Sequence, residues 1–239
     1  MKLVGHRGVR ALSPENTLPS FQLAVDYNLD GIETDVWMTK DGELVLIHDA
    51  TVDRTTDGSG RVTEMTLAEL RRLDAGAHFA SNFKNVRIPL LSEFLDLVKD
   101  NEILLNIELK DYRREALNKT IAMVEAHGLR DRIVITSFSP DVTTWAVKDH
   151  KLRTQGFPPA SYGENYNEAV YDEMYAVGIP MNELTKELVD HYTVRGIEAW
   201  CWCPDTDEAV RQAIASGAVL ATVNDPRPAL RILKGEGQS

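Results

Sequence analysis

Two carboxylates stand two positions apart in an otherwise apolar run of the sequence, GIETDVW at 31–37. Residues i and i+2 of a β-strand point to the same face, so Glu33 and Asp35 would point together if this run is a strand. Two carboxylates at such close range repel each other unless a positive charge lies between them. That charge could be an Arg or Lys side chain from a neighbouring strand, or a metal ion.

A second pair with the same spacing occurs in NIELK, where Glu108 and Lys110 stand near the end of another apolar run. Three carboxylates without zinc-type thiols favour a hard divalent cation held by oxygen atoms, Mg²⁺ or Ca²⁺. Such an ion would neutralise Glu33 and Asp35. It could also keep open positions for a phosphate oxygen and act on it as a Lewis acid.

Histidines and a further cation occur where two other apolar runs end. His6 and Arg7 close the first run of the chain, and His48 follows a short run at 44–47. Two imidazoles with pKa values near neutrality are suited to act as general acid and general base on a P–O bond. Arg7 and Lys110 could hold the phosphoryl oxygens. Each residue alone also fits a structural role, but together they predict a site for a metal and a phosphate.

The elements that must position these residues alternate regularly along the chain. Short apolar runs typical of strands are separated by segments of helical period. Eight strands joined by helices predict a (β/α)8, or TIM, barrel, in which active sites lie at the carboxyl ends of the strands. An open doubly wound sheet is the alternative. The expected strands are 2–6, 31–37, 103–110, 132–138, 152–157, 178–183, 197–202 and 218–224, and the expected helices are 15–28, 92–100, 114–128, 140–150, 167–178, 185–196 and 207–217.

One segment interrupts this alternation. Between the second strand and the helix at 92–100 lies a short strand-like run at 43–49, followed by some forty residues without a regular pattern. This is too long for an ordinary loop between a strand and a helix. We therefore predict a single barrel domain over residues 1–239, with a small inserted cap subdomain at 49–91.

Composition excludes several classes of function. The chain has 239 residues, a net charge of −11 and no stripe of clustered Lys and Arg, so we expect neither nucleic-acid binding nor stable membrane association. It shows no apolar segment of signal-peptide or membrane-spanning type, which indicates a cytoplasmic protein. Cys201 and Cys203 are the only cysteines, as expected for buried thiols in a reducing compartment. No feature of the sequence indicates an oligomeric state.

Ordered motifs extend over nearly the whole chain. They are HRG (6–8), PENT (14–17), an ExD pair (33–35), DGELVLIHD (41–49), DRTTDGSG (53–60), RIP (87–89), an ExK pair (108–110) and TVNDP (222–226). In this order they closely resemble the glycerophosphodiester phosphodiesterases. The resemblance implies a TIM barrel with a small cap after the second strand. It also implies hydrolysis of a glycerophosphodiester, a small-molecule substrate, to an alcohol and sn-glycerol 3-phosphate with the help of a divalent metal.

The resemblance also assigns roles by position. The implied metal ligands are Glu33, Asp35 and Glu108, the implied acid/base pair is His6 and His48, the implied phosphate-binding residues are Arg7 and Lys110, and Trp200 is implied to pack against the glycerol. Which histidine is the base stays open. The attacking nucleophile is either water or the 2-hydroxyl of the substrate's glycerol, and the second would give a cyclic phosphate intermediate.

The sequence departs from the family pattern where the alcohol side of the pocket is expected. The stretch at 200–203 reads WCWC where the family usually reads WTVN, and residues 155–183 show no family pattern. These departures put the alcohol leaving group in doubt but leave the phosphodiester cleavage untouched. Three alternatives to the implied reaction stay open. The enzyme could act on a sugar- or lysophospholipid-type phosphodiester, it could be a lyase that stops at a cyclic phosphate, or the chain could be a non-catalytic barrel that binds phosphodiesters.

Overall fold

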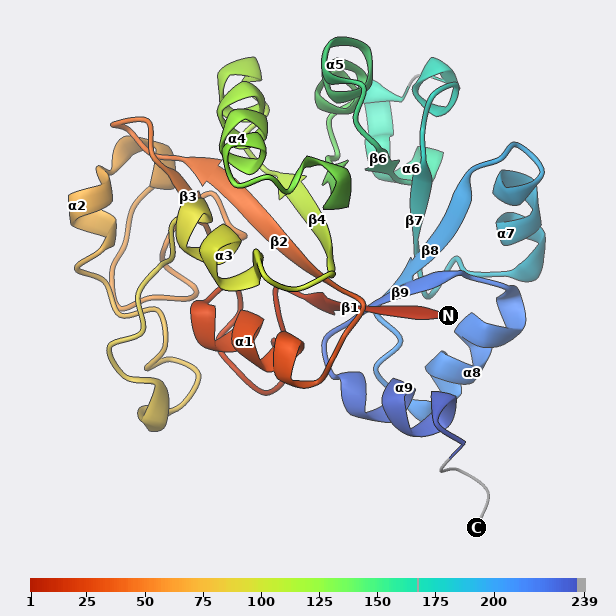
Figure 1. The fold of residues 1–239 in the computed structure, drawn as a ribbon, viewed down its shortest axis with the longest axis horizontal. Coiled ribbons are helices and arrows are strands. Elements are labelled where there is room, and N and C mark those ends of the chain that lie inside the picture. The colour runs from red at the N-terminus through yellow and green to blue at the C-terminus, as the bar shows by residue number, and fades with distance from the viewer. Residues whose placement is uncertain (167, 236–239) are drawn as a thin grey trace.

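A closed barrel of parallel strands forms the centre of the molecule (Figure 1). The computed structural model describes residues 1–166 and 168–235, and within them eight parallel strands close on each other because β1 pairs with both β9 and β2. These strands are β1 (Lys2–His6), β2 (Gly31–Met38), β4 (Leu104–Leu109), β5 (Ile133–Thr136), β6 (Thr154–Gly156), β7 (Ala176–Pro180), β8 (Glu198–Trp202) and β9 (Leu220–Val223). The TIM barrel is confirmed, and the open sheet is excluded.

Helices surround the barrel and bury its outer face (Figure 1). They are α1 (Leu18–Asp26), α3 (Leu91–Val98), α4 (Arg114–Ala126), α5 (Pro140–His150), α6 (Pro159–Tyr162), α7 (Lys186–Thr193), α8 (Asp207–Ser216) and α9 (Pro226–Leu233). The last of these follows naturally from its sequence, because Asp225 accepts a hydrogen bond from the backbone N–H of Arg227 and Pro226 occupies the first helical turn. In the part of the chain that the structure describes, every helix is too short or too polar to cross a bilayer.

The helix expected at 167–178 is wrong. Residue 167 lies outside the described residues, a short 3₁₀ turn occupies Glu168–Tyr171, and β7 already begins at Ala176. The reason is burial on both faces: a parallel strand in a barrel is a continuous apolar run, and Ala176–Pro180 is such a run. The strand therefore takes residues that a helical period had suggested.

The barrel interior is arranged in layers. Val4, Val134, Ala176, Trp200 and Leu220 form an apolar cluster that is separate from the core between strands and helices. Because side chains alternate between the two faces of a strand, residues two or four positions further along these strands also point inward, nearer the carboxyl ends. The layer above the apolar cluster is therefore the place where the inward-facing polar residues gather.

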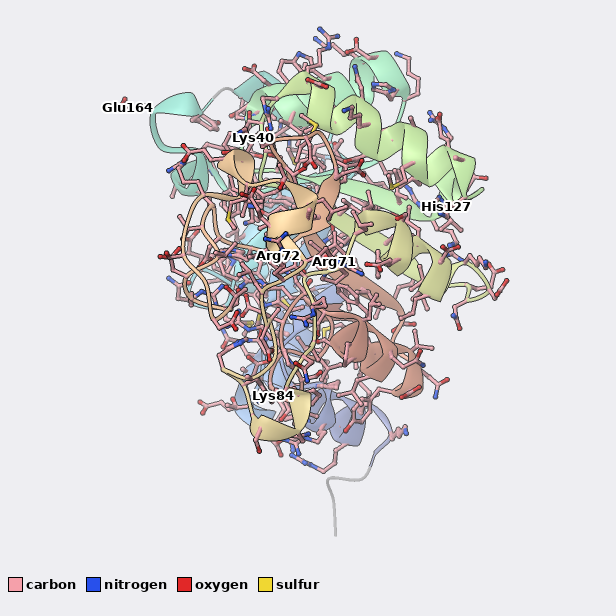
Figure 2. All side chains as sticks on the ribbon, turned by 90° about the vertical axis from the view of Figure 1, so that its left-hand side faces the viewer. Lys40, Arg71, Arg72, Lys84, His127 and Glu164 are labelled. Carbon is pink, nitrogen blue, oxygen red and sulfur yellow. The ribbon has the colours of Figure 1, made fainter. Side chains whose placement is uncertain are left out.

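The irregular segment 49–91 follows β3 (Leu44–Leu46), which runs antiparallel to β2. It contains α2 (Leu67–Leu70) and short 3₁₀ turns, and it lies at the left of Figure 1. A small apolar cluster of its own holds it together; its members are Val45, Ile47, Val52, Val62, Leu70, Ala75 and Ile88. Figure 2 views this side face on, with Arg71, Arg72 and Lys84 labelled on the segment.

Candidate active site

A cavity lies at the carboxyl ends of the strands, and most of the predicted site residues meet there. Six of them line it, namely His6, Arg7, Glu33, His48, Glu108 and Lys110. Asp35 lies directly behind this lining and is fully buried. The other lining residues are Asn106, Thr136, Phe138, Gln155, Phe157, Trp202 and Thr222.

The three carboxylates predicted as metal ligands form one buried group. Strand register explains this, because His6 of β1 is level with Glu33, and Asp35 of β2 is level with Glu108 of β4. Each carboxylate offers an oxygen, and these oxygens all lie within 4.8 Å of one another. Glu33 Oε1 and Asp35 Oδ1 are buried and have no hydrogen-bond partner among the described residues. Buried oxygens without partners are costly, so this donor set fits a cation held by oxygen atoms.

Two side-chain cations also lie beside the carboxylates, as the salt-bridge alternative predicted. Arg7 Nε is 3.3 Å from Asp35 Oδ2, and Lys110 Nζ is 3.4 Å from Asp35 Oδ1. Lys110 also donates to Glu108, and the backbone N–H of Arg7 donates to Glu33 Oε2 at 2.9 Å. With all three carboxylates ionised, the two side-chain cations would leave one negative charge unbalanced, which a bound metal ion could offset.

The pKa values of the trio diverge for physical reasons. Burial, and then the charges of Asp35 and Glu108, raise the pKa of Glu33 well above its ordinary value. Burial and the charge of Asp35 raise the pKa of Glu108 to about 7. Burial would also raise the pKa of Asp35, but the nearby Lys110 and Arg7 outweigh it and lower that pKa. Asp35 is therefore the member that stays ionised most firmly.

His6 is held by the far end of the chain. Its Nδ1 lies 2.6 Å from Asn224 Oδ1, and the Asn224 amide donates to Asp205 Oδ2 at 2.6 Å, so the Asn224 oxygen faces the ring. This places the proton of the neutral ring on Nδ1 and leaves Nε2, 3.9 Å from Glu33 Oε2, as the free nitrogen. Burial and the charge of Arg7 lower the pKa of His6 to about 3.

His48 is held differently, by its own neighbour. The chain reaches it directly after β3, where the backbone N–H of Ile47 donates to the Asp35 carbonyl at 3.1 Å. Trp37 Nε1 donates to the His48 carbonyl at 3.2 Å, and His48 Nδ1 lies 2.7 Å from Asp49 Oδ1. Burial lowers the pKa of His48. As in His6, the second ring nitrogen, Nε2, has no hydrogen-bond partner among the residues that the structure describes.

The remaining lining residues form an uncharged wall of the cavity, and sequence reasoning missed it. Phe138 and Phe157 stack with ring centroids 3.7 Å apart, and Trp202 also lines the cavity. Asn106 donates to Gln155 Oε1 at 2.9 Å. A signal was present, because Phe138, Phe157 and Trp202 each stand at the end of a predicted strand, as His6 does.

Trp200, which the resemblance implies as a glycerol contact, is not among the described residues that line the cavity. It is 2% exposed and packs in the apolar layer with Val4 and Leu220. Its indole nitrogen donates to Glu198 Oε2 at 2.8 Å. Trp202, two positions further along β8, points to the same face one layer higher and lines the cavity.

Comparison with known proteins fixes the family. Residues 6–227 match the family model described as "Glycerophosphoryl diester phosphodiesterase family". The chain belongs to this family. One curated relative, "Glycerophosphodiester phosphodiesterase" of Caldanaerobacter subterraneus subsp. tengcongensis, is 32% identical over 243 residues, which cover 98% of each chain. Membership places the chain among the phosphodiesterases and confirms the resemblance drawn from the motifs.

Solved structures of the family share the fold. A glycerophosphodiester phosphodiesterase from Agrobacterium tumefaciens superposes with a TM-score of 0.82 at 26% identity, covering 95% of this chain and 98% of the other. A phosphodiesterase from Oleispira antarctica, solved in complex with the product sn-glycerol-3-phosphate, gives a TM-score of 0.89 at 23% identity and covers 98% and 97%. The second likeness, at this low identity, supports the barrel fold.

Proposed function

We propose that this protein hydrolyses glycerophosphodiesters to an alcohol and sn-glycerol 3-phosphate in a reaction that depends on a divalent cation. The observation that carries the proposal is the convergence, at one cavity, of three buried carboxylates, two imidazoles and two cations. Family membership and a relative that holds sn-glycerol 3-phosphate support the same conclusion.

The proposed metal ligands are Glu33, Asp35 and Glu108. All three donors are oxygen atoms, which favours Mg²⁺ or Ca²⁺ over a softer metal. When bound, such a cation polarises a phosphoryl oxygen and neutralises charge that develops on it.

Arg7 and Lys110 are the proposed phosphate-binding residues. Arg7 is held on one side by Asp35 and on the other by Glu15, whose Oε1 accepts from Arg7 Nη1 at 2.8 Å. These contacts fix the guanidinium at the cavity wall. Lys110 Nζ lies at the other side of Asp35 and carries three N–H donors, more than its carboxylate partners occupy. The two cations would orient the phosphodiester between them.

The two imidazoles are proposed to move the protons. In each ring Nδ1 is occupied, by Asn224 in His6 and by Asp49 in His48, and Nε2 is free for the reacting atoms. One ring, neutral, would take the proton of the attacking hydroxyl at Nε2, and the other, carrying a second proton on Nε2 as an imidazolium, would donate that proton to the departing alkoxide. Hydrogen bonding at Nδ1 holds each ring in a fixed orientation, which such a transfer requires.

The uncharged wall would contact the carbon-bearing parts of the substrate. Phe138 and Trp202 offer apolar surface. Trp202 Nε1 is buried and has no hydrogen-bond partner among the described residues, so it is available to donate to a substrate hydroxyl or ester oxygen. We propose Trp202, in place of Trp200, as the tryptophan that contacts the substrate.

The direct test is a turnover screen with glycerophosphocholine, glycerophosphoethanolamine, glycerophosphoglycerol and glycerophosphoinositol. We expect release of sn-glycerol 3-phosphate that EDTA abolishes and that Mg²⁺ or Ca²⁺ restores. Phosphorus NMR of the products separates hydrolysis from a lyase reaction, in which a cyclic phosphate would accumulate. Turnover that is insensitive to EDTA, or affinity for these substrates without turnover, would contradict the proposal.

A further inference from the structure

His48 differs from the other proposed site residues because it follows β3, which lies outside the closed ring of parallel strands, whereas the others lie on barrel strands or directly after them. It stands directly before the segment 49–91, and its ring is about one-third exposed. A partly exposed side chain on irregular backbone has rotational freedom that a side chain inside the barrel lacks. Something must therefore hold the His48 ring against the cavity.

Asp49 is the direct support of the ring, and Arg54 supports Asp49. Arg54 Nε donates to Asp49 Oδ2 at 2.7 Å, and Arg54 Nη2 donates to Asp49 Oδ1 at 3.0 Å. Two parallel N–H bonds from one guanidinium fix the plane of the carboxylate as well as its position. The Asp49 carboxylate, and the His48 Nδ1 bonded to it, are thus oriented by Arg54.

The same guanidinium also donates hydrogen bonds to Glu15, in the loop that follows β1 of the barrel. Arg54 Nη1 donates to Glu15 Oε2 at 3.0 Å, and Nη2 donates to Glu15 Oε1 at 2.7 Å. Glu15 lies in the loop between β1 and α1, its side chain is 9% exposed, and it also accepts from Arg7. A continuous chain of hydrogen-bonded charges therefore runs from Arg7 through Glu15, Arg54 and Asp49 to His48.

These hydrogen-bonded charges hold their geometry more firmly than an ordinary surface ion pair does. An isolated exposed pair contributes about 0–1 kcal/mol, but a bidentate network with a buried carboxylate holds its geometry more firmly. Burial alone would raise the pKa of Glu15, yet the bonds from Arg54 and the charge of Arg7 lower it to about 2. Glu15, at the centre of the network, therefore interacts strongly with both Arg54 and Arg7.

We propose that Arg54 is a positioning residue, which sets the His48 ring relative to Arg7 by clamping Asp49 to Glu15. The proposal rests on the proposed function for its kinetic consequence only. A lysine could not replace this arginine, since an ammonium group has no planar fork that bonds two carboxylates in parallel.

The segment offers a matched control. Arg71 forms a bidentate pair of the same kind with Glu93 of α3, at 2.7 Å and 2.8 Å, and ties the same segment to the barrel at a place that does not touch His48. Figure 2 shows Arg71 on the surface of this segment. Removal of Arg71 therefore weakens the attachment of the segment without removing the clamp on Asp49.

The experiment compares Arg54→Gln, Arg54→Lys and Arg71→Gln in the full chain. We expect Arg54→Gln to lower kcat on the order of 10- to 100-fold with KM within about twofold, because a misplaced proton-transfer group affects the chemical step. Arg54→Lys should recover little of the loss. Arg71→Gln should lower the melting temperature about as much as Arg54→Gln but keep kcat within about twofold. Equal kcat losses in Arg54→Gln and Arg71→Gln, or full recovery in Arg54→Lys, would overturn the proposal.

A spectroscopic readout tests the positioning independently of turnover. Long-range ¹H–¹⁵N correlation spectra of the imidazoles, with the His48 signals assigned by their loss in His48→Gln, report which ring nitrogen carries the proton. We expect the Nδ1–H form in the wild type and in Arg71→Gln, and a shift toward a tautomer mixture in Arg54→Gln. Unchanged His48 signals in Arg54→Gln would refute the clamp. If the wild type shows no turnover, the proposed function fails while this measurement still decides the positioning role.

Discussion

The two halves of the barrel contribute different chemistry to one cavity. β1, β2, β4 and the chain after β3 supply every charged or titratable group that lines it among the described residues, whereas β5, β6, β8 and β9 supply amide, hydroxyl and aromatic side chains. The charged half matches what a phosphoryl group and a metal require. The uncharged half matches what an alcohol and a carbon skeleton require. Under the proposed function, cleavage and choice of substrate would be encoded by separate parts of the chain.

Removal of a carboxylate from the charged half should have the largest effect. We expect Glu108→Gln to lower kcat/KM on the order of a thousandfold or more, because a lost metal ligand removes several kcal/mol of charge stabilisation. A titration with Mg²⁺ and Ca²⁺ should show weakened activation. The exposed Glu102 near the opposite end of β4 provides the control, and Glu102→Gln should behave as the wild type. An unchanged metal dependence in Glu108→Gln would argue against it as a ligand.

Loss of either imidazole should have the next largest effect. We expect His6→Ala and His48→Ala each to lower kcat about 10²- to 10³-fold, within the usual range for general acid or base catalysis. Because both act in one reaction, the double variant should lose much less than the product of the two single losses. Steady-state kinetics with glycerophosphocholine measures all three. Near-normal turnover in either single variant would remove that histidine from the mechanism.

Changes in the uncharged half should be smaller and should depend on the alcohol. Trp202→Phe keeps an aromatic ring and removes one N–H donor, which is worth about 1 kcal/mol, or roughly a fivefold change in kcat/KM. We expect the ratio of kcat/KM between glycerophosphocholine and glycerophosphoinositol to change as well. Trp200→Phe is the control, since that residue lies one layer lower; it should affect the melting temperature more than turnover. The opposite pattern would restore Trp200 as the substrate contact.

The smallest effect concerns stability and pH. The pKa of Glu15 is about 2 in the folded protein against an ordinary value of 4.5, so its contribution to the free energy of unfolding is complete above pH 5 and is lost as the pH falls through this interval. The difference in the free energy of unfolding between the wild type and Glu15→Gln should therefore shrink by roughly 1 kcal/mol between pH 6 and pH 4. Urea unfolding at both pH values measures it. A constant difference would contradict the lowered pKa.

The charged half could be predicted from the sequence because charged residues are unusual within or directly after apolar strands. Carboxylates such as Glu33 and Asp35 in an apolar strand need a partner, and strand alternation supplies the geometry. The strand ends of a TIM barrel converge, so residues far apart in sequence could be placed together. The barrel itself followed from the alternation of strand and helix patterns.

The uncharged half could not be predicted in this way. An aromatic residue at a strand end, such as Phe138 or Phe157, has the same sequence signature as a core residue, and only the packing shows that it faces a cavity. The choice between Trp200 and Trp202 depends on which interior layer each reaches, which alternation alone does not decide. Asn224 and Arg54 lie in motifs that the sequence shows, TVNDP and DRTTDGSG, but their roles as supports of the imidazoles depend on contacts with His6 and Glu15 that only the fold reveals.

The contact between His6 and Asn224 has a consequence for the synthesis and folding of the protein. Asn224 is 218 positions from His6 and stands just beyond the strand that seals the cylinder. A nascent polypeptide emerging from the ribosome therefore carries its acidic cluster early but lacks an oriented first imidazole until its final strand is released. A chain that ends before residue 224 lacks this contact, so under the proposed mechanism it should not turn over a glycerophosphodiester.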